Sequence, residues 1–522
     1  MNGIRARRLG AGASALVLCA LLAASCARDR GADRLRLSFQ TEPSTFDPAF
    51  CVDVSSGTVS ALVHATLVSF DVDARIAPGL ARRWEITDDG LEYRFHLGAG
   101  RFSNGRRVAA ADVVYSFRRL LDPATASPRW WLLRPARGAQ AFHEGGPWNG
   151  ETASALDDST VVIRLEAPVP HFLGLLAMPS AGIVCREEVE RFGPLYGRNP
   201  CGSGPWRLAS WREGDEIVFE PNPGWGGAPA GVAALSFRII PEQMTQIAEF
   251  EVGSLDLIEV PRAELEHWRA AGADLRSREE LRVVYIGLNT ARPPLDDPRV
   301  RRALNHAVDV EKIIAQVLFG AGRRARGAVP PGLRLWEESA ERYPYDPAAA
   351  RRLLAEAGRG EGFRLEIWQR ENPEAGRILE AVQGYLARVG IETRLVTREW
   401  SAFKEAIDRG VPDAFYIDWI ADYPDAENFL APLFHSANAG GGGNRTGYRN
   451  ARVDSLLDAA AGLMDDGRRR ECQRAAEEIV YRDAPWIFLW FPERYEMTSS
   501  RVSGYEIPLI FNAQRFLDVR LR

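Results

Sequence analysis

The chain has 522 residues, of which 46% are hydrophobic and 26% are charged, and its formal net charge at pH 7 is −5. This is the composition of a folded protein, and the length exceeds what one hydrophobic core serves, so two or three lobes are expected. The negative net charge argues against nucleic acid as a partner.

The first 26 residues predict an export signal. Arginines precede an apolar run from about residue 11 to residue 22, and small residues follow up to Cys26. The run is too short to span a bilayer permanently. Its end, AASC, resembles a bacterial lipoprotein signal, in which the cysteine is lipidated and becomes the first mature residue. A plain secretory signal is the alternative, because Ala23 stands where leucine is usual. Both interpretations place the protein outside the cytoplasmic membrane.

Four cysteines follow the signal, at Cys51, Cys185, Cys201 and Cys472. Outside the cytoplasm they can pair, and four cysteines allow three pairings. We prefer Cys185 with Cys201, which a loop with Gly and Pro separates. None has C-x-x-C spacing, so no zinc site is predicted.

The N-terminal half contains strand and helix patterns. Apolar and polar residues alternate around Tyr93, Phe95 and Leu97 and again over 159–168, as in half-buried strands. Between them, residues 109–123 have helical spacing and end at a proline.

In the C-terminal half, predicted helices and strands alternate. One long helix is expected from Asp297 to Gly320, followed by a helix over 346–358 and a strand over 363–370. A helix over 377–390 and a strand over 391–400 repeat the order. This alternation predicts an α/β fold with some parallel strand pairing.

Motifs for catalysis are missing from the sequence. It has no G-x-S-x-G elbow and no P-loop lysine, and its seven histidines lack metal-ligand spacing. We therefore expect no enzyme, no cofactor and no metal. A secreted hydrolase with a dispersed site stays an alternative.

Residues 414–430, AFYIDWIADYPDAENFL, begin like a buried strand and then become acidic. Asp422 before the YPD segment has two interpretations. Aspartate and proline are common in turns, so it can simply shape the chain. A carboxylate at a strand end can also bind a cation.

Seven segments occur in the order seen in the extracytoplasmic oligopeptide- and dipeptide-binding proteins of ABC importers, which the chain resembles from about Leu35 to Arg522. They are EPSTFDP, PGLARRWEITDDGLEYRFHL, ADVVYSFRRLLDPATASP, ALDDSTVVIRLEAPVPHFL, NPCGSGPWRL, GLNTARPPLDDPRVRRALNHAVD and DWIADYPDAENFL.

The resemblance implies an α/β clamp of two lobes (class II of the periplasmic binding proteins), with an additional domain inserted in the first lobe, that closes over its ligand. Carried onto this chain, it implies a signal peptide at 1–26, a first lobe (domain I) at 33–69, 198–284 and 493–522, an additional domain (domain II) at 70–197, and a second lobe (domain III) at 285–492.

The resemblance also implies a site. Asp422 matches the acidic residue that pairs with a peptide's α-amino group, which needs an opposite charge once it leaves water. The strand from Asp418 through Trp419 to Ile420 would lie alongside the peptide and bind its main chain.

Further ligand contacts are implied at Val54 and Tyr285, and side-chain pockets at Trp400 and Trp419. For each of these, core packing is the alternative. Two residues depart from the family pattern, Asp418 at a frequent glycine and Arg129 at a tyrosine that can touch ligand, and both can alter specificity.

Arg370 matches an arginine that dipeptide-binding members use for the peptide carboxylate. Its alternative is a solvated charge at a strand end. Tyr416 stands where binders of longer peptides can carry an arginine, which favours short ligands.

The expected partners are a short peptide, the permease subunits of an ABC importer and the membrane, through a lipid on Cys26. We expect a monomer in the periplasm or on the outer face of the cytoplasmic membrane. A nickel chelate, haem or an oligosaccharide bound by the same fold is the main alternative.

Replacing Cys26 with Ser should release the protein from membranes, because acyl chains would supply the attachment. Fractionation of cells that carry parent or variant measures this. Equal membrane association of the two proteins would contradict lipidation.

Overall fold

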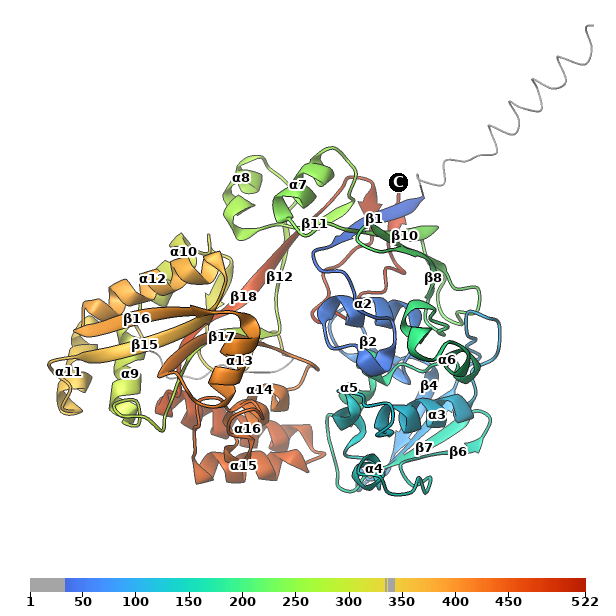
Figure 1. Cartoon of the computed structure of the whole chain (residues 1–522), viewed down its shortest axis with the longest axis horizontal. Helices are drawn as coiled ribbons and strands as arrows, with labels where there is room; N and C mark the ends of the chain where they lie inside the picture. The colour runs from blue at the N-terminus through green and yellow to red at the C-terminus, as the bar shows by residue number, and fades with distance from the viewer. Residues whose placement is uncertain (1–32, 334–335, 337–342) are drawn as a thin grey trace, which may run out of the picture.

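The computed structural model describes residues 33–333, 336 and 343–522, and the predicted signal and Cys26 lie outside them. Figure 1 shows two groups of elements joined by long strands. No helix within the described residues is both long and apolar enough to cross a membrane.

The N-terminal strand belongs to a four-stranded sheet of order β1-β10-β9-β8. Its first strand is parallel to a strand some 200 residues later, whereas the other pairs are antiparallel. Leu35, Trp206 and Phe219 are fully buried in its core, together with Leu62 of a neighbouring helix. The elements are β1 (Arg34–Phe39), β10 (Ala234–Ile239), β9 (Glu216–Pro221), β8 (Trp206–Arg212) and the helix α2 (Val54–Val63).

A second four-stranded sheet, of order β4-β5-β7-β6, is antiparallel throughout. The alternation around Tyr93 correctly predicted β5, and the helical spacing correctly predicted α3, whose buried face includes Val113 and Phe117. The elements are β4 (Ala81–Ile86), β5 (Glu92–Leu97), β7 (Thr160–Arg164), β6 (Ala153–Asp157) and α3 (Ala110–Leu121).

The largest sheet has eight strands, in the order β11-β18-β13-β17-β15-β16, with β12 and β14 also paired to β18. It mixes antiparallel pairs with the parallel pairs β15–β16 and β15–β17, as the alternating pattern predicted. The strands are β11 (Leu257–Glu259), β12 (Arg276–Glu279), β13 (Arg282–Leu288), β14 (Gly322–Arg324), β15 (Phe363–Arg370), β16 (Ile391–Arg398), β17 (Ala414–Ile420) and β18 (Trp486–Thr498).

Helices cover both faces of this sheet. Successive residues of β13 point to opposite faces, so Val283 and Tyr285 join one core, and Val284 and Ile286 join the other. The first core includes α13 (Trp400–Asp408), α14 (Glu427–Phe434), α15 (Ala451–Ala461) and α16 (Asp466–Asp483), and the second includes α9 (Pro298–Ala307), α10 (Val310–Gln316), α11 (Pro347–Glu356) and α12 (Pro373–Ala387).

The single helix expected from Asp297 to Gly320 is wrong, because two helices occupy this range. Val308 is extended, and the Asp309 side chain accepts a hydrogen bond from the Lys312 N–H, which starts a new helix at Val310. Asp309 is the N-cap residue of the second helix, so the amphipathic pattern over 297–320 belongs to two consecutive helices and not to one.

In Figure 1, strand β18 runs from the group that contains β15 and β17 toward β11 and α7 (Gln243–Glu251). Its first part pairs with β13 and β14, and its last part with β11 and β12. The predicted lobe boundaries at 284/285 and 492/493 lie inside β13 and β18, so these strands continue across them. The division into three domains stays a prediction.

The remaining helices are short, and the remaining strands form two separate two-stranded sheets. They are β2 (Val68–Phe70), β3 (Ile76–Pro78), α4 (Ala139–His143), α5 (Phe172–Leu176), α6 (Arg186–Phe192), α7 (Gln243–Glu251), α8 (Leu265–Ala270), β19 (Val502–Ser503) and β20 (Arg520–Leu521).

The four cysteines of the described residues are free thiols, so the preferred disulfide between Cys185 and Cys201 is not formed in this structure. The two thiols nevertheless influence each other, since the pKa of Cys185 is raised and the pKa of Cys201 is lowered to about 7, each mainly by the other thiol. The pairing in the oxidising compartment stays a prediction.

A buried carboxylate ties the N-terminal strand to the end of β18. Asp256 has no exposed area and accepts hydrogen bonds from the backbone N–H of Arg36 at 2.9 Å, its Nη2 at 2.8 Å and Ser499 Oγ at 3.0 Å. Burial by itself raises the pKa of Asp256, but the bonds from Arg36 outweigh it and lower that pKa below its ordinary value.

Asp256→Asn should lower the free energy of unfolding by about 2 to 3 kcal/mol at pH 7, because it removes charged hydrogen bonds. Since the folded pKa lies below the unfolded one, this contribution is present above the unfolded pKa and is lost as the pH falls through the folded pKa. Chemical denaturation at pH 7 and pH 3 measures it. The exposed Asp88→Asn is the control, and a loss equal to the control's would contradict the role of Asp256.

Candidate ligand-binding site

Strand β17 is fully paired on only one of its two edges. On the β13 side its pairs run from Ala414 with Leu288 to Ile420 with Arg282. On the other side its pairs with β15 in the described structure end at Phe415. The backbone N–H and C=O groups over 416–420 that point away from β13 are therefore available to an extended chain on that edge.

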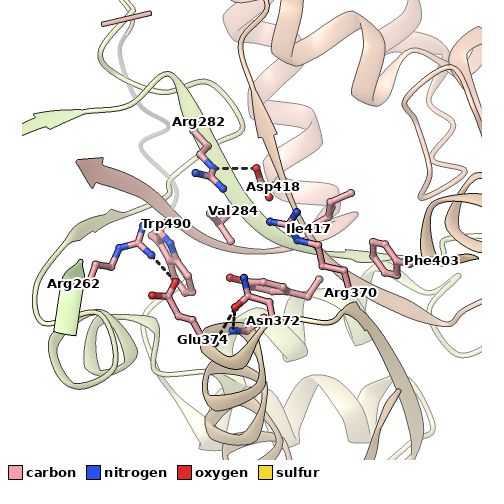
Figure 2. Close-up of a pocket in the computed structure, with 12 residues that line it drawn as sticks. Arg262, Arg282, Val284, Arg370, Asn372, Glu374, Phe403, Ile417, Asp418 and Trp490 are labelled. Carbon is pink, nitrogen blue, oxygen red and sulfur yellow. Dashed lines mark hydrogen bonds and ion pairs between the residues drawn. The ribbon is translucent and has the colours of Figure 1, made fainter. Parts of the chain in front are cut away.

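A small cavity of about 60 Å³ lies beside this edge (Figure 2). Arg282 Nε is 3.0 Å from Asp418 Oδ2, and Arg262 Nη1 is 2.5 Å from Glu374 Oε1. Arg370 also lines the cavity, and no carboxylate of the described residues lies within ion-pair distance of it. The cavity thus offers an uncompensated guanidinium.

Arg282 keeps its charge although it is largely enclosed. Burial by itself lowers the pKa of its guanidinium, but Asp418 and Glu280 outweigh burial and raise that pKa above its ordinary value. The Asp418 carboxylate is therefore already paired with Arg282 and is not available to a cationic group of a ligand.

Two further cavities, of about 250 and 130 Å³, continue along the strand. Arg282 lines the first cavity and the 250 Å³ cavity, and Val54 and Ile420 line both larger ones. We call these three cavities together the cleft. Val54 and Ile420 are 52% and 45% exposed, so they present apolar surface within it.

Asp422 lines the 130 Å³ cavity at the far end of the cleft from Arg370. Its nearest cation is Arg129, with 3.6 Å between Nη1 and Oδ1, and its carboxylate accepts no hydrogen bond from the described residues. Burial raises the pKa of Asp422 above its ordinary value, and Arg129 only partly opposes this. Asp422 is partly exposed, with 36% of its side chain accessible, so a carboxylate with this little compensation favours a cationic ligand group.

The structure brings six of the predicted site residues to the cleft: Val54, Arg129, Arg370, Asp418, Ile420 and Asp422. Their roles toward a ligand stay predictions.

The three aromatic site residues lie elsewhere. Tyr285 is 1% exposed and stacks on Trp486 at 3.5 Å, so its side chain belongs to the core and is not accessible to a ligand here. Trp419 packs against the same core, with its indole N–H buried. Trp400 is 46% exposed, and the guanidinium of Arg370 lies 5.7 Å from its ring.

The sequence analysis missed three charged residues of the first cavity, Arg262, Arg282 and Glu374. Arg282 faces the cleft because β13 pairs with β17, a contact across 136 positions. Nothing in the local sequence separates it from the other arginines. No group of three or more potential metal ligands occurs in the described part of the chain.

Comparisons with known proteins bear on this cleft. A family model described as bacterial extracellular solute-binding proteins, family 5 Middle, matches residues 75–441. The chain is 32% identical over 486 residues to heme-binding protein A of Haemophilus influenzae, covering 89% of this chain and 88% of that protein. It is 28% identical over 510 residues to the dipeptide-binding protein of Escherichia coli, covering 93% and 94%.

A solved structure is also similar. The periplasmic binding protein DppA from Helicobacter pylori, in complex with the peptide STSA, gives a TM-score of 0.78 at 26% identity, covering 94% of this chain and 98% of that chain. This likeness confirms the predicted α/β two-lobe clamp.

Asp422→Asn should leave the free energy of unfolding of the ligand-free protein unchanged or raise it by up to about 1 kcal/mol, because it removes a poorly compensated charge. Since burial raises the folded pKa of Asp422, the difference should vanish at low pH, where the carboxyl is protonated in both states. Denaturant titration after ligand removal measures it. The control is the exposed Asp458→Asn, and a clear loss in Asp422→Asn alone would reveal a stabilising role.

Proposed function

Because the chain belongs to the bacterial extracellular solute-binding proteins of family 5, we propose that it captures short peptides in the cleft and delivers them to the permease of an ABC importer. It acts by binding, without chemical change of the ligand. A lipid on Cys26 holds it at the outer face of the cytoplasmic membrane, as a monomer.

One observation carries this proposal: the half-paired edge of β17 lies between an anion and a cation. The edge supplies main-chain groups over 416–420, which an extended peptide binds as an added strand. Asp422 at one end takes the peptide's ammonium, and Arg370 at the other takes its carboxylate. The main chain and both termini of the ligand thus have complementary partners. Its side chains contribute little to recognition.

The register of β15 limits the ligand's length. Its last pairs join Ile367 with Ala414 and Trp368 with Phe415, so the same register brings Arg370 level with Ile417. From there to Asp422 is five positions, and an extended chain advances about 3.3 to 3.6 Å per residue, so peptides of no more than about five residues fit. The dipeptide-binding relative and the relative solved with the four-residue peptide STSA have ligands within this range.

Haem is the second candidate ligand, because one relative is named heme-binding protein A. The two candidates differ in what they need from Asp422, since a peptide presents an ammonium and haem presents none. Mass spectrometry of ligand released from the purified protein, together with its absorption spectrum, distinguishes them.

Asp422→Asn should weaken binding of trialanine by about 2 to 5 kcal/mol, mainly because the ammonium loses its opposite charge. Acetylating the peptide's N-terminus should cost a similar amount in the parent protein. The same acetylation should cost little more in the variant, because both changes delete one interaction. Titration calorimetry on these four combinations measures the coupling.

Asp458→Asn, on the exposed face of α15, is the matched control and should bind trialanine like the parent. Additive losses from the two changes would show that Asp422 does not hold the amine. Haem binding that Asp422→Asn leaves unaltered, without peptide binding, would replace the proposal by the second candidate.

A further inference from the structure

A fourth cavity, of about 380 Å³, adjoins the cleft beside β11. It shares Val54, Glu259 and Arg494 with the 250 Å³ cavity, so the two cavities are neighbours. Val54 also lines the 130 Å³ cavity that contains Asp422. A side chain of a ligand bound in the cleft can therefore reach the fourth cavity by passing Val54.

Three charged residues line the fourth cavity, and two of them compensate each other. Arg494 Nε lies 3.2 Å from Glu496 Oε1, and the Tyr505 hydroxyl donates to Glu496 Oε2 at 2.5 Å. The third residue is Glu259, whose carboxylate has no ion pair and accepts no hydrogen bond within the described part of the chain. Glu259 is thus the uncompensated charge of this cavity.

Glu259 is the last residue of β11, which pairs it with Glu496 of β18. Its side chain is exposed because it faces the open cavities, yet the cavity walls surround it. Burial between these walls raises the pKa of Glu259 above its ordinary value, and Glu280 and Glu496 add to this effect. Arg494 and Arg262 oppose it only in part. A cation beside Glu259 would therefore be bound favourably.

The neighbours of Glu259 leave this place to a ligand. Arg262 is paired with Glu374 at 2.5 Å, as Figure 2 shows. Gln40 and Gln243 line the fourth cavity together with Glu259, and their side-chain amides make no hydrogen bond to other described residues. An ammonium group has three donors, so one carboxylate and two amide oxygens are suitable acceptors for it.

We propose that Glu259 is a specificity-determining residue, and that the cavity beside it binds the basic side chain of a short peptide. This inference rests on the proposed function, in which Asp422 takes the α-ammonium. The first and second residues of the peptide then lie nearest to Val54, at the entrance to the fourth cavity. Successive residues of an extended chain point to opposite sides, so only one of these two positions directs its side chain toward Glu259.

Four tripeptides test the inference. Lys-Ala-Ala and Ala-Lys-Ala are each compared with the peptide in which norleucine, which lacks the side-chain ammonium, replaces lysine. Titration calorimetry should show that lysine binds at least about tenfold more tightly than norleucine at one position, as expected for a charged hydrogen bond, and about equally at the other. A preference at neither position overturns the inference. An equal preference at both overturns it too, because general attraction to a protein of net charge −5 would produce that result.

Glu259→Gln should remove the preference by weakening the favoured lysine peptide at least about tenfold while leaving its norleucine counterpart unchanged. Glu259→Asp, which keeps the charge, should retain part of the preference. Glu251→Gln, at the exposed end of α7, is the control and should behave like the parent. Equal weakening of the lysine and norleucine peptides in Glu259→Gln would mean that Glu259 only supports the shape of the cleft, and would overturn the inference.

Trialanine separates this inference from the proposed function. Binding of trialanine without a lysine preference overturns the inference alone. Failure of trialanine and all four tripeptides to bind overturns both. The peptide comparison uses the parent protein, so it stands even when a variant folds poorly.

Discussion

The site depends on one constraint in the largest sheet: β17 has a complete partner on one edge and an incomplete one on the other. Strand β13 fixes its position along all seven residues, and β18 fixes β13 in turn. The pairing of β15 with β17 ends at Phe415. On that edge, residues 416 to 420 therefore have backbone groups without strand partners in the described fold. An enclosed strand edge of this kind invites an added strand, and charged residues at its two ends favour a ligand with both termini free.

Asp256 and Asp422 show how the same side chain serves stability or binding according to its neighbours. Asp256 receives several donors from Arg36 and Ser499, so its charge is fully compensated although no solvent reaches it. Asp422 lies opposite a single cation at 3.6 Å. Asp256 therefore stabilises the fold through its own hydrogen bonds. Asp422 lacks such bonds, and a bound ligand can supply them. Asp418 lies between these cases, because Arg282 already neutralises it at 3.0 Å.

The cleft joins segments that no single sheet contains. Val54 begins α2, Arg129 precedes a 3-10 helix, and Ile420 and Asp422 end a strand of the eight-stranded sheet. Strand β18 pairs with β13 in its first part and with β11 in its last part. A ligand held between Arg129 and Asp422 would contact segments from both sides of the cleft.

Local patterns in the sequence determined the elements around the site. The alternation over 363–370 and the helical spacing of 109–123 gave β15 and α3, and the order of seven motifs identified the family. The position of Asp422 directly after a strand could also be read from the chain. Apart from the order of the motifs, each of these features depends on residues that are close together in the sequence.

Only the tertiary structure decided which of these residues a ligand can reach. Tyr285 turned into the core because the register of β13 sends odd-numbered residues to that face. The Asp418 carboxylate is paired with Arg282, which lies 136 positions away in the sequence. The open edge of β17 exists because its pairing with β15 stops after two residues. Pairing, register and charge compensation are long-range contacts, so no local pattern in the sequence records them.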